Sequence, residues 1–173
     1  ASAFMFLIDS RKHASLLPNQ ILPAASSIKI AILLITLEMI DTGQMEWNEN
    51  LVLTKDLVGG GAGWMGYQTI GKTFPVYEAA TEMIRISDNT ATNLLINRLG
   101  GKSYINKRLK QIGLASTKLN NLLPDLEGTN KTTAKDLALT IALADSGNLL
   151  GQRSRDLFRE ILSTSKSNRL LPG

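Results

Sequence analysis

The apolar positions of this sequence predict a mostly helical protein with a short pair of strands near its N-terminus. Residues 3–8 form an apolar run of strand length that a polar turn follows, and residues 14–17 could supply the paired strand of a hairpin. The longest apolar run, residues 30–37, lies within a helix predicted over residues 26–42. Because that helix is apolar on nearly every side, we expect it to be buried all round.

Helical periodicity returns in five later segments of the chain, which are residues 76–86, 90–99, 102–111, 134–144 and 154–162. Thr132 is the expected capping residue of the fourth segment, and a polar loop over 120–130 precedes it.

Because an isolated hairpin is only marginally stable, the N-terminal strands need partners that nothing in the chain supplies. We therefore expect the 173 residues to be a piece of a larger fold, or to be completed by another chain.

Composition narrows the classes of protein without selecting one. The 43% hydrophobic and 20% charged residues are typical of a soluble globular protein. The net charge of +4 comes from scattered basic residues, which argues against nucleic acid as a partner. There is no cysteine, which excludes a thiolate nucleophile, and the one histidine, His13, is predicted in an exposed loop. We therefore predict no metal site and no cofactor.

The candidate chemistry begins with Ser26 and Lys29, at the start of the long apolar helix. Residues three apart on a helix share one face, so these side chains are expected to lie one turn apart. A serine hydroxyl is a poor nucleophile until a base takes its proton, and a lysine whose pKa is lowered by burial can be that base. The N-terminus of the helix would also place its positive end beside developing negative charge.

The Ser-x-x-Lys spacing is not specific by itself. Ser163 and Lys166 repeat it in a polar stretch that no apolar helix follows. Serine is also common at the start of a helix as a plain cap. Taken alone, helix capping explains Ser26 better than catalysis does.

A second pattern, Gly66–Thr73, matches the phosphate-binding G-x-x-x-x-G-K-T loop letter by letter. That loop requires a buried strand before it and a helix directly after it. Here glycines with Trp64 and Met65 precede the pattern, and Pro75 follows it. We therefore do not expect Lys72 to bind a nucleotide.

Ser87-Asp88-Asn89 lies on the connection between two predicted helices and changes the interpretation of Ser26. Ser87 could pass a proton between Lys29 and a leaving nitrogen, and Asn89 could hydrogen-bond an amide of a substrate. The alternative is a turn made of ordinary turn-forming residues.

Together the two motifs, with Thr-Ala-Thr-Asn-Leu-Leu after the second, resemble the penicillin-recognising serine enzymes and, more narrowly, the class A β-lactamase branch. The resemblance runs from about Phe4 to Pro172 and implies an α+β fold of the β-lactamase/transpeptidase type. It implies N-terminal strands of a sheet domain over 1–25, a helical domain with the nucleophile helix over 26–165, and a return towards the sheet domain over 166–173.

In that family a Lys-Thr-Gly strand completes the site, and this sequence contains no such triplet. The family places it after the Leu-Leu-Pro region, where this sequence ends. The resemblance therefore implies a missing C-terminal segment, or a second chain, that completes the sheet and supplies Lys-Thr-Gly with one oxyanion donor.

The loop around Leu123 bears on the fate of an acyl-enzyme. Class A β-lactamases carry Glu-Pro-Glu-Leu-Asn there, and its first Glu and last Asn hold the water that hydrolyses the acyl-enzyme. Aligned on Pro124 and Leu126, this chain has Leu123 in place of that Glu and Glu127 in place of the Asn. A leucine cannot activate water, so a β-lactam adduct on Ser26 should be long-lived, as in the class-A-like penicillin-binding proteins of the A type.

The resemblance thus implies a serine D-alanyl-D-alanine peptidase of the bacterial periplasm or cell envelope, which acts on peptidoglycan stem peptides and takes β-lactams as covalent inhibitors. It implies Ser26 as the nucleophile, with half of the oxyanion hole from its backbone N–H, and Lys29 as the base. Ser87 would protonate the leaving D-Ala and Asn89 would orient the acyl chain. Trp64 could line the cleft or belong to the core.

Two other functions remain open from the sequence. One is a true β-lactamase that uses Glu127 as the base for deacylation. The other is a catalytically silent sensor domain of the same fold that β-lactams acylate.

Overall fold

The structure is a computed structural model that describes residues 1–7, 10 and 12–166. Its helices are α1 (Ile28–Asp41), α2 (Val76–Arg85), α3 (Asn89–Arg98), α4 (Gly101–Gln111), α5 (Ala134–Asp145) and α6 (Gln152–Ser163). Its strands are β1 (Ala3–Phe6), β2 (His13–Leu16), β3 (Leu22–Pro23), β4 (Asn50–Val52), β5 (Thr73–Pro75) and β6 (Lys131–Thr132). Short 3₁₀ turns lie at Ala25–Ser27, Lys55–Leu57 and Met65–Tyr67.

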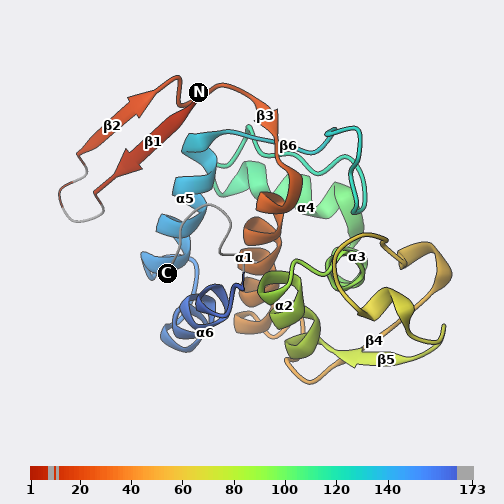
Figure 1. The fold of residues 1–173 in the computed structure, drawn as a ribbon. Coiled ribbons are helices and arrows are strands. Elements are labelled where there is room, and N and C mark those ends of the chain that lie inside the picture. Colours follow the sequence, from red (N-terminus) through yellow and green to blue (C-terminus); the bar gives the residue numbers. More distant parts are fainter. Residues whose placement is uncertain (8–9, 11, 167–173) are drawn as a thin grey trace.

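Helix α1 runs through the middle of the helical body, with α5 and α6 on one side and α2 and α3 on the other (Figure 1). The consecutive residues 32–35 are fully buried, so every side of the helix is covered, as its apolar sequence predicts. Its polar residues Lys29 and Thr36 are buried as well. Thr36 donates its hydroxyl to the Ile32 carbonyl at 2.8 Å. Lys29 requires partners from outside the helix.

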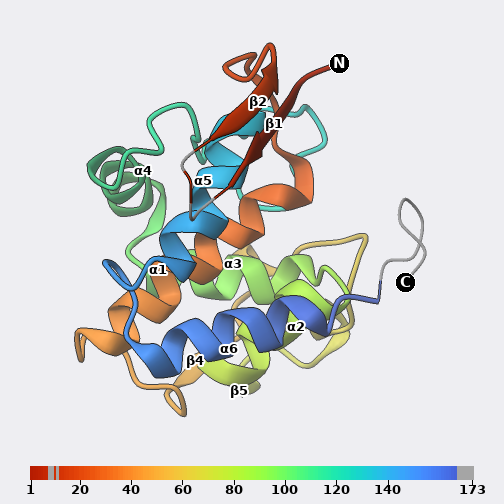
Figure 2. The ribbon, with the colours of Figure 1, turned by 90° about the vertical axis from the view of Figure 1, so that its left-hand side faces the viewer.

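The predicted N-terminal hairpin is present. Strands β1 and β2 pair antiparallel, with Phe6 opposite His13. The hairpin stands out from the helical body over α5, as Figure 1 and Figure 2 show. Phe4 and Phe6 are half-buried while the residues between and beside them are exposed, the alternation of a strand with one covered face. His13 differs from the loop residue expected: it opens β2, and its ring stacks 5.6 Å from that of Phe4.

Two further strand pairs are not predicted by the sequence. Strand β3 pairs with β6, where Leu22 lies opposite Thr132, and β4 pairs with β5. Strands of two or three residues are too short for an alternating pattern to become visible. The prediction that Thr132 caps α5 is therefore wrong by one residue. The cap is Thr133, whose hydroxyl accepts the Asp136 N–H at 3.0 Å.

The Gly66–Thr73 stretch does not have the surroundings of a phosphate-binding loop. A 3₁₀ turn leads into it, and β5 begins at its last residue, where a helix would be needed. Lys72 donates its Nζ to the side chain of Gln68 at 2.8 Å and lies over the ring of Trp64. Its charge therefore has partners within the loop.

Beyond Lys166, the predicted return to a sheet domain lies outside the described residues. Across the described part of the chain, no helix combines the length and the apolar character needed to cross a bilayer.

Leu34→Ala should destabilise the fold far more than the same change at an exposed leucine. Leu34 is fully buried in α1, so truncation leaves a cavity and lowers the free energy of unfolding by about 2–5 kcal/mol. The matched control is Leu126→Ala in the exposed loop, which should change it by less than about 0.5 kcal/mol. Urea denaturation of both variants measures the difference, and equal losses would contradict the central position of α1.

Candidate active site

Ser26 is presented by a short turn that leads into α1. It lies inside the 3₁₀ turn Ala25–Ser27, and neither that turn nor α1 has a side-chain hydrogen bond at its cap, so Ser26 is not a helix cap. The residue before it, Ala25, has a φ of +45°, a left-handed conformation that costs energy in a residue with a Cβ. The Ser26 side chain is exposed, which leaves its hydroxyl open to a substrate.

Lys29 lies one turn further along, and its amino group is enclosed by acceptors. Only 2% of the residue is exposed. Its Nζ donates to the Ser87 carbonyl at 2.6 Å, to Ser87 Oγ at 2.9 Å and to Asn89 Oδ1 at 2.9 Å. Each of the three protons of the charged form therefore has a partner.

The surroundings of Lys29 shift its protonation equilibrium towards the neutral amine. Burial lowers the pKa of Lys29 from 10.5 to about 8, and the negative charge of Asp88 partly opposes that shift. At pH 7 about one molecule in ten therefore carries an amine with a free lone pair, a much larger fraction than for a lysine in water. Lys29 has the property that a general base requires.

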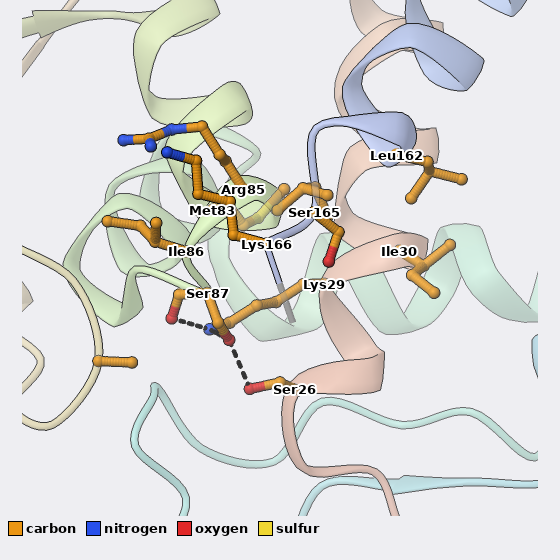
Figure 3. A pocket seen from close by; sticks show the side chains of 12 residues that line it. Ser26, Lys29, Ile30, Met83, Arg85, Ile86, Ser87, Leu162, Ser165 and Lys166 are labelled. Atoms are coloured by element: carbon orange, nitrogen blue, oxygen red, sulfur yellow. Dashed lines mark hydrogen bonds between the residues drawn. The ribbon is translucent and has the colours of Figure 1, made fainter. Parts of the chain in front are cut away.

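Ser87 connects this amine to Ser26. Its hydroxyl lies 2.9 Å from Ser26 Oγ and 2.9 Å from Lys29 Nζ, and Figure 3 shows it between the two. Because a hydroxyl both donates and accepts, a proton that leaves Ser26 can pass to Ser87 while the proton of Ser87 passes to the amine. The hydrogen-bonded route from nucleophile to base thus runs through Ser87.

The turn that carries Ser87 is held by Asp88. Ser87 has a φ of +61°, which needs support from its surroundings. The Asp88 side chain is fully buried and accepts the Ala91 N–H at 2.9 Å, which caps α3. It also accepts the backbone N–H groups of Trp64 and Met65 at 2.7 and 2.9 Å. One carboxylate thus joins the turn, the helix and the glycine-rich loop formed by residues 59–66.

Asn89 lies between Lys29 and the glycine-rich loop and is buried. Its Oδ1 accepts from Lys29, its Nδ2 donates to the Gly60 carbonyl at 2.8 Å, and its backbone N–H donates to the Ala62 carbonyl at 3.1 Å. The loop can approach this closely because its glycines lack side chains: a Cβ at Gly63 would lie 2.1 Å from the Asp88 carboxyl. The protein itself therefore uses both ends of the Asn89 amide, which the sequence assigns to the substrate.

A cavity of about 640 Å³ opens beside these residues, within the usual size of small-molecule sites. Ser26, Lys29 and Ser87 line it, together with the last turns of α2 and α6. Trp64 is not among its lining residues. Its indole donates to Glu82 at 2.7 Å and meets the Phe74 ring edge-on at 5.8 Å, as the core alternative for this tryptophan implies.

The polar loop after α4 is tied to α3 close to Asn89. Asn93 donates to the Leu123 carbonyl at 2.7 Å and accepts the Leu123 N–H at 2.8 Å. Leu123 is 5% exposed, whereas Glu127 is exposed and does not line the cavity. A Cβ at Gly59 would lie 2.5 Å from the Leu123 carbonyl and 2.9 Å from Asn89 Cβ, so this loop and the site are in close contact.

Sequence reasoning assigns no role to Asp88, Asn93 or Glu82, although each supports the site. The signal for Asn93 is a polar residue beside Leu94 and Leu95 in a helical segment, which predicts a buried amide with backbone partners. Some of their contacts are local: Arg85 pairs with Glu82, and the Ala91 N–H donates to Asp88, each from three residues away. The partners that join distant segments, Trp64, Leu57 and Leu123, lie 18 to 36 residues away along the chain. No local pattern predicts them.

Comparison with known proteins places this geometry in context. The model of the beta-lactamase enzyme family matches residues 2–173. Beta-lactamase BRO-1 of Moraxella catarrhalis is 28% identical over 156 residues, which are 87% of this chain and 50% of that protein. Beta-lactamase ROB-1 of Haemophilus influenzae is 31% identical over 95 residues, which are 51% of this chain and 31% of that protein.

Solved structures are similar to this chain over more of its length than these two proteins are. PBP-A superposes with a TM-score of 0.95 at 38% identity, covering 99% of this chain and 64% of that one. A leucine-to-glutamate variant of PBP-A, solved as an acyl-enzyme complex with penicillin G, superposes with a TM-score of 0.93 at 37% identity. The match covers 96% of this chain and 63% of that one. A beta-lactamase of Sphaerobacter thermophilus superposes with a TM-score of 0.84 at 25% identity, covering 97% of this chain and 64% of that one. The predicted α+β fold is confirmed, and the chain spans about half of BRO-1 and just under two thirds of PBP-A.

Asp88→Asn should lower the pKa of Lys29 below about 8, because the Asp88 charge is what opposes the effect of burial. The measurement is a titration of the Lys29 Cε signal by NMR with ¹³C-labelled lysine, assigned by its loss in Lys29→Met. Asp56→Asn removes an exposed carboxylate and should leave the pKa unchanged. A rise in the Asp88→Asn variant would mean that the variant admits water to the amine and that the charge matters less than the packing.

Proposed function

Because the chain belongs to the beta-lactamase enzyme family, we propose that it acts as a penicillin-binding serine D-alanyl-D-alanine peptidase on peptidoglycan stem peptides. The observation that favours a peptidase over a β-lactamase is Leu123. It is an apolar, buried side chain in the loop where class A β-lactamases carry the glutamate that activates water. The similarity to PBP-A over nearly the whole chain supports the same choice.

The proposed reaction forms an ester on Ser26. Ser26 Oγ attacks the carbonyl carbon of the penultimate D-Ala while its proton passes through Ser87 to Lys29. The bond from that carbon to the nitrogen of the last D-Ala then breaks, and the proton returns through Ser87 to that nitrogen. The products are the acylated Ser26 and free D-Ala, and water or an acceptor amine then takes the acyl group.

The start of α1 supports the transition state of this reaction. The backbone N–H of Ser26 would form half of the oxyanion hole, beside the positive end of α1. The second donor and a Lys-Thr-Gly strand are required from a further segment or a second chain, since this sequence has no such triplet. In this proposal residues 1–25 belong to the sheet domain that this strand would complete.

Asn89 takes a modified role in this proposal. Its Oδ1 and one Nδ2 proton are engaged with Lys29 and Gly60, which leaves the second Nδ2 proton for the acyl chain of the substrate. β-Lactams, as covalent inhibitors, would occupy the same site. We place the enzyme in the bacterial periplasm or cell envelope, where its substrate lies.

Penicillin G should form an adduct with the complete protein that persists for hours. The physical reason is that Ser26 and Lys29 supply acylation, whereas neither Leu123 nor the exposed Glu127 supplies a base for the deacylating water. Intact mass followed over time measures the adduct, and Ser26→Ala should abolish it. Rapid loss of the adduct with consumption of drug would instead establish a β-lactamase, as the matches to BRO-1 and ROB-1 would favour.

A sensor domain would also form a lasting adduct, so the peptide reaction decides between sensor and enzyme. Release of D-Ala from a peptide that ends in D-Ala-D-Ala, lost in Ser26→Ala, supports the peptidase. An adduct without any release of D-Ala supports the sensor.

Leu123→Glu should speed the release of the penicilloyl adduct. A carboxylate at this position could hold and deprotonate a water near the ester, and tenfold faster deacylation corresponds to about 1.4 kcal/mol of the activation free energy. Because Leu123 is buried, the variant should also be less stable by roughly 1–3 kcal/mol. Leu123→Gln, of similar size but not a base, is the control. No gain over Leu123→Gln would show that the loop has been misplaced.

A further inference from the structure

We propose that Glu82, at the end of α2, is a positioning residue for acyl transfer at Ser26. It acts by holding Trp64 and, through Trp64, the glycine-rich loop that supports Asn89. Glu82 itself touches none of the reacting groups. The inference rests on the proposed function of Ser26.

The Glu82 carboxylate is an anchored, charged acceptor. The residue is 7% exposed, and Arg85 donates to it from Nε and Nη2, each at 2.6 Å. These bonds from Arg85 hold the pKa of Glu82 below its usual range, so the group is ionised at neutral pH. The Trp64 indole N–H donates to the same carboxylate at 2.7 Å. An ion pair that only stabilised the end of a helix would not need the indole.

Glu82 also holds the turn of the site through its backbone. Its carbonyl accepts the Asp88 N–H at 3.1 Å, and the Asp88 carboxylate accepts the Trp64 N–H at 2.7 Å. Trp64 is thus fixed at its backbone by Asp88 and at its indole by Glu82. The three residues form a closed ring of hydrogen bonds between the end of α2, the turn and the loop.

The loop transmits this position to the base. Trp64 follows Gly63, which packs against Asp88 without room for a Cβ. Two carbonyls of the loop, from Gly60 and Ala62, accept hydrogen bonds from Asn89, and the Oδ1 of Asn89 accepts a hydrogen bond from Lys29 Nζ. Because these contacts are close and buried, a displaced Trp64 would shift the loop and loosen Asn89 from the amine.

The test compares Glu82→Ala, Trp64→Phe and their double variant in penicillin acylation of the complete protein. Each single change should lower the acylation rate constant by about tenfold while the initial binding constant changes little, because misplacement of groups acts on the chemical step. The double variant should be no slower than the slower single one, since both changes remove the same contact. Glu82→Gln, whose amide oxygen can still accept the indole N–H, should stay within about threefold of the wild type. Glu78→Ala, on the first turn of the same helix, is the control and should be unaffected.

A titration of Lys29 tests the inference without β-lactam chemistry. In Glu82→Ala the loosened loop should admit water, so that the pKa of Lys29 rises from about 8 towards 10.5, whereas Glu78→Ala should leave it in place. An unchanged pKa together with an unchanged acylation rate would overturn the positioning role. A shifted pKa in a protein that penicillin never acylates would support the positioning role and overturn the proposed function.

Discussion

The arrangement of the site depends on the burial of one amine, that of Lys29. A buried ammonium group without partners is costly, so the fold must bring acceptors to it. It receives three, two from Ser87 in the turn between α2 and α3 and one from Asn89 at the start of α3, about 60 residues along the chain. This requirement fixes the distance between α1 and that turn. The same contact places the Ser87 hydroxyl between Lys29 and Ser26.

The negative charge of Asp88 partly opposes the effect of burial on the pKa of Lys29. Burial alone would lower the pKa of Lys29 further, while a nearby carboxylate favours the charged form. With both, the pKa lies near 8, and the group can accept and return a proton near neutral pH. Asp88 achieves this while its own oxygens are filled by backbone N–H groups. The residues that shape the loop therefore also set the chemistry of the base.

The sequence predicts the parts of this structure that are periodic or adjacent. The helices and the hairpin follow from apolar spacing, and Ser26 with Lys29 follows from a spacing of three. The same spacing at Ser163 and Lys166 shows why such a motif needs its surroundings. Ser163 ends α6, where its hydroxyl bonds back to the Glu160 carbonyl and where the negative end of the helix lies. The short strands, the partners of Asn93 and the contact of Glu82 with Trp64 arise from distant segments and leave no local pattern.

The contacts between Asn93 and Leu123 bear on how one fold could either retain an acyl group on Ser26 or release it. Asn93 holds Leu123 by its backbone N–H and carbonyl and does not depend on its side chain. The loop can therefore keep its place beside Asn89 whichever side chain stands at this position, apart from the free energy of burying it. In the proposed mechanism, acylation depends on Ser26, Lys29 and Ser87, which this loop does not supply. In the proposed mechanism, whether the ester persists is thus a property of one side chain, and whether it forms is a property of the buried amine.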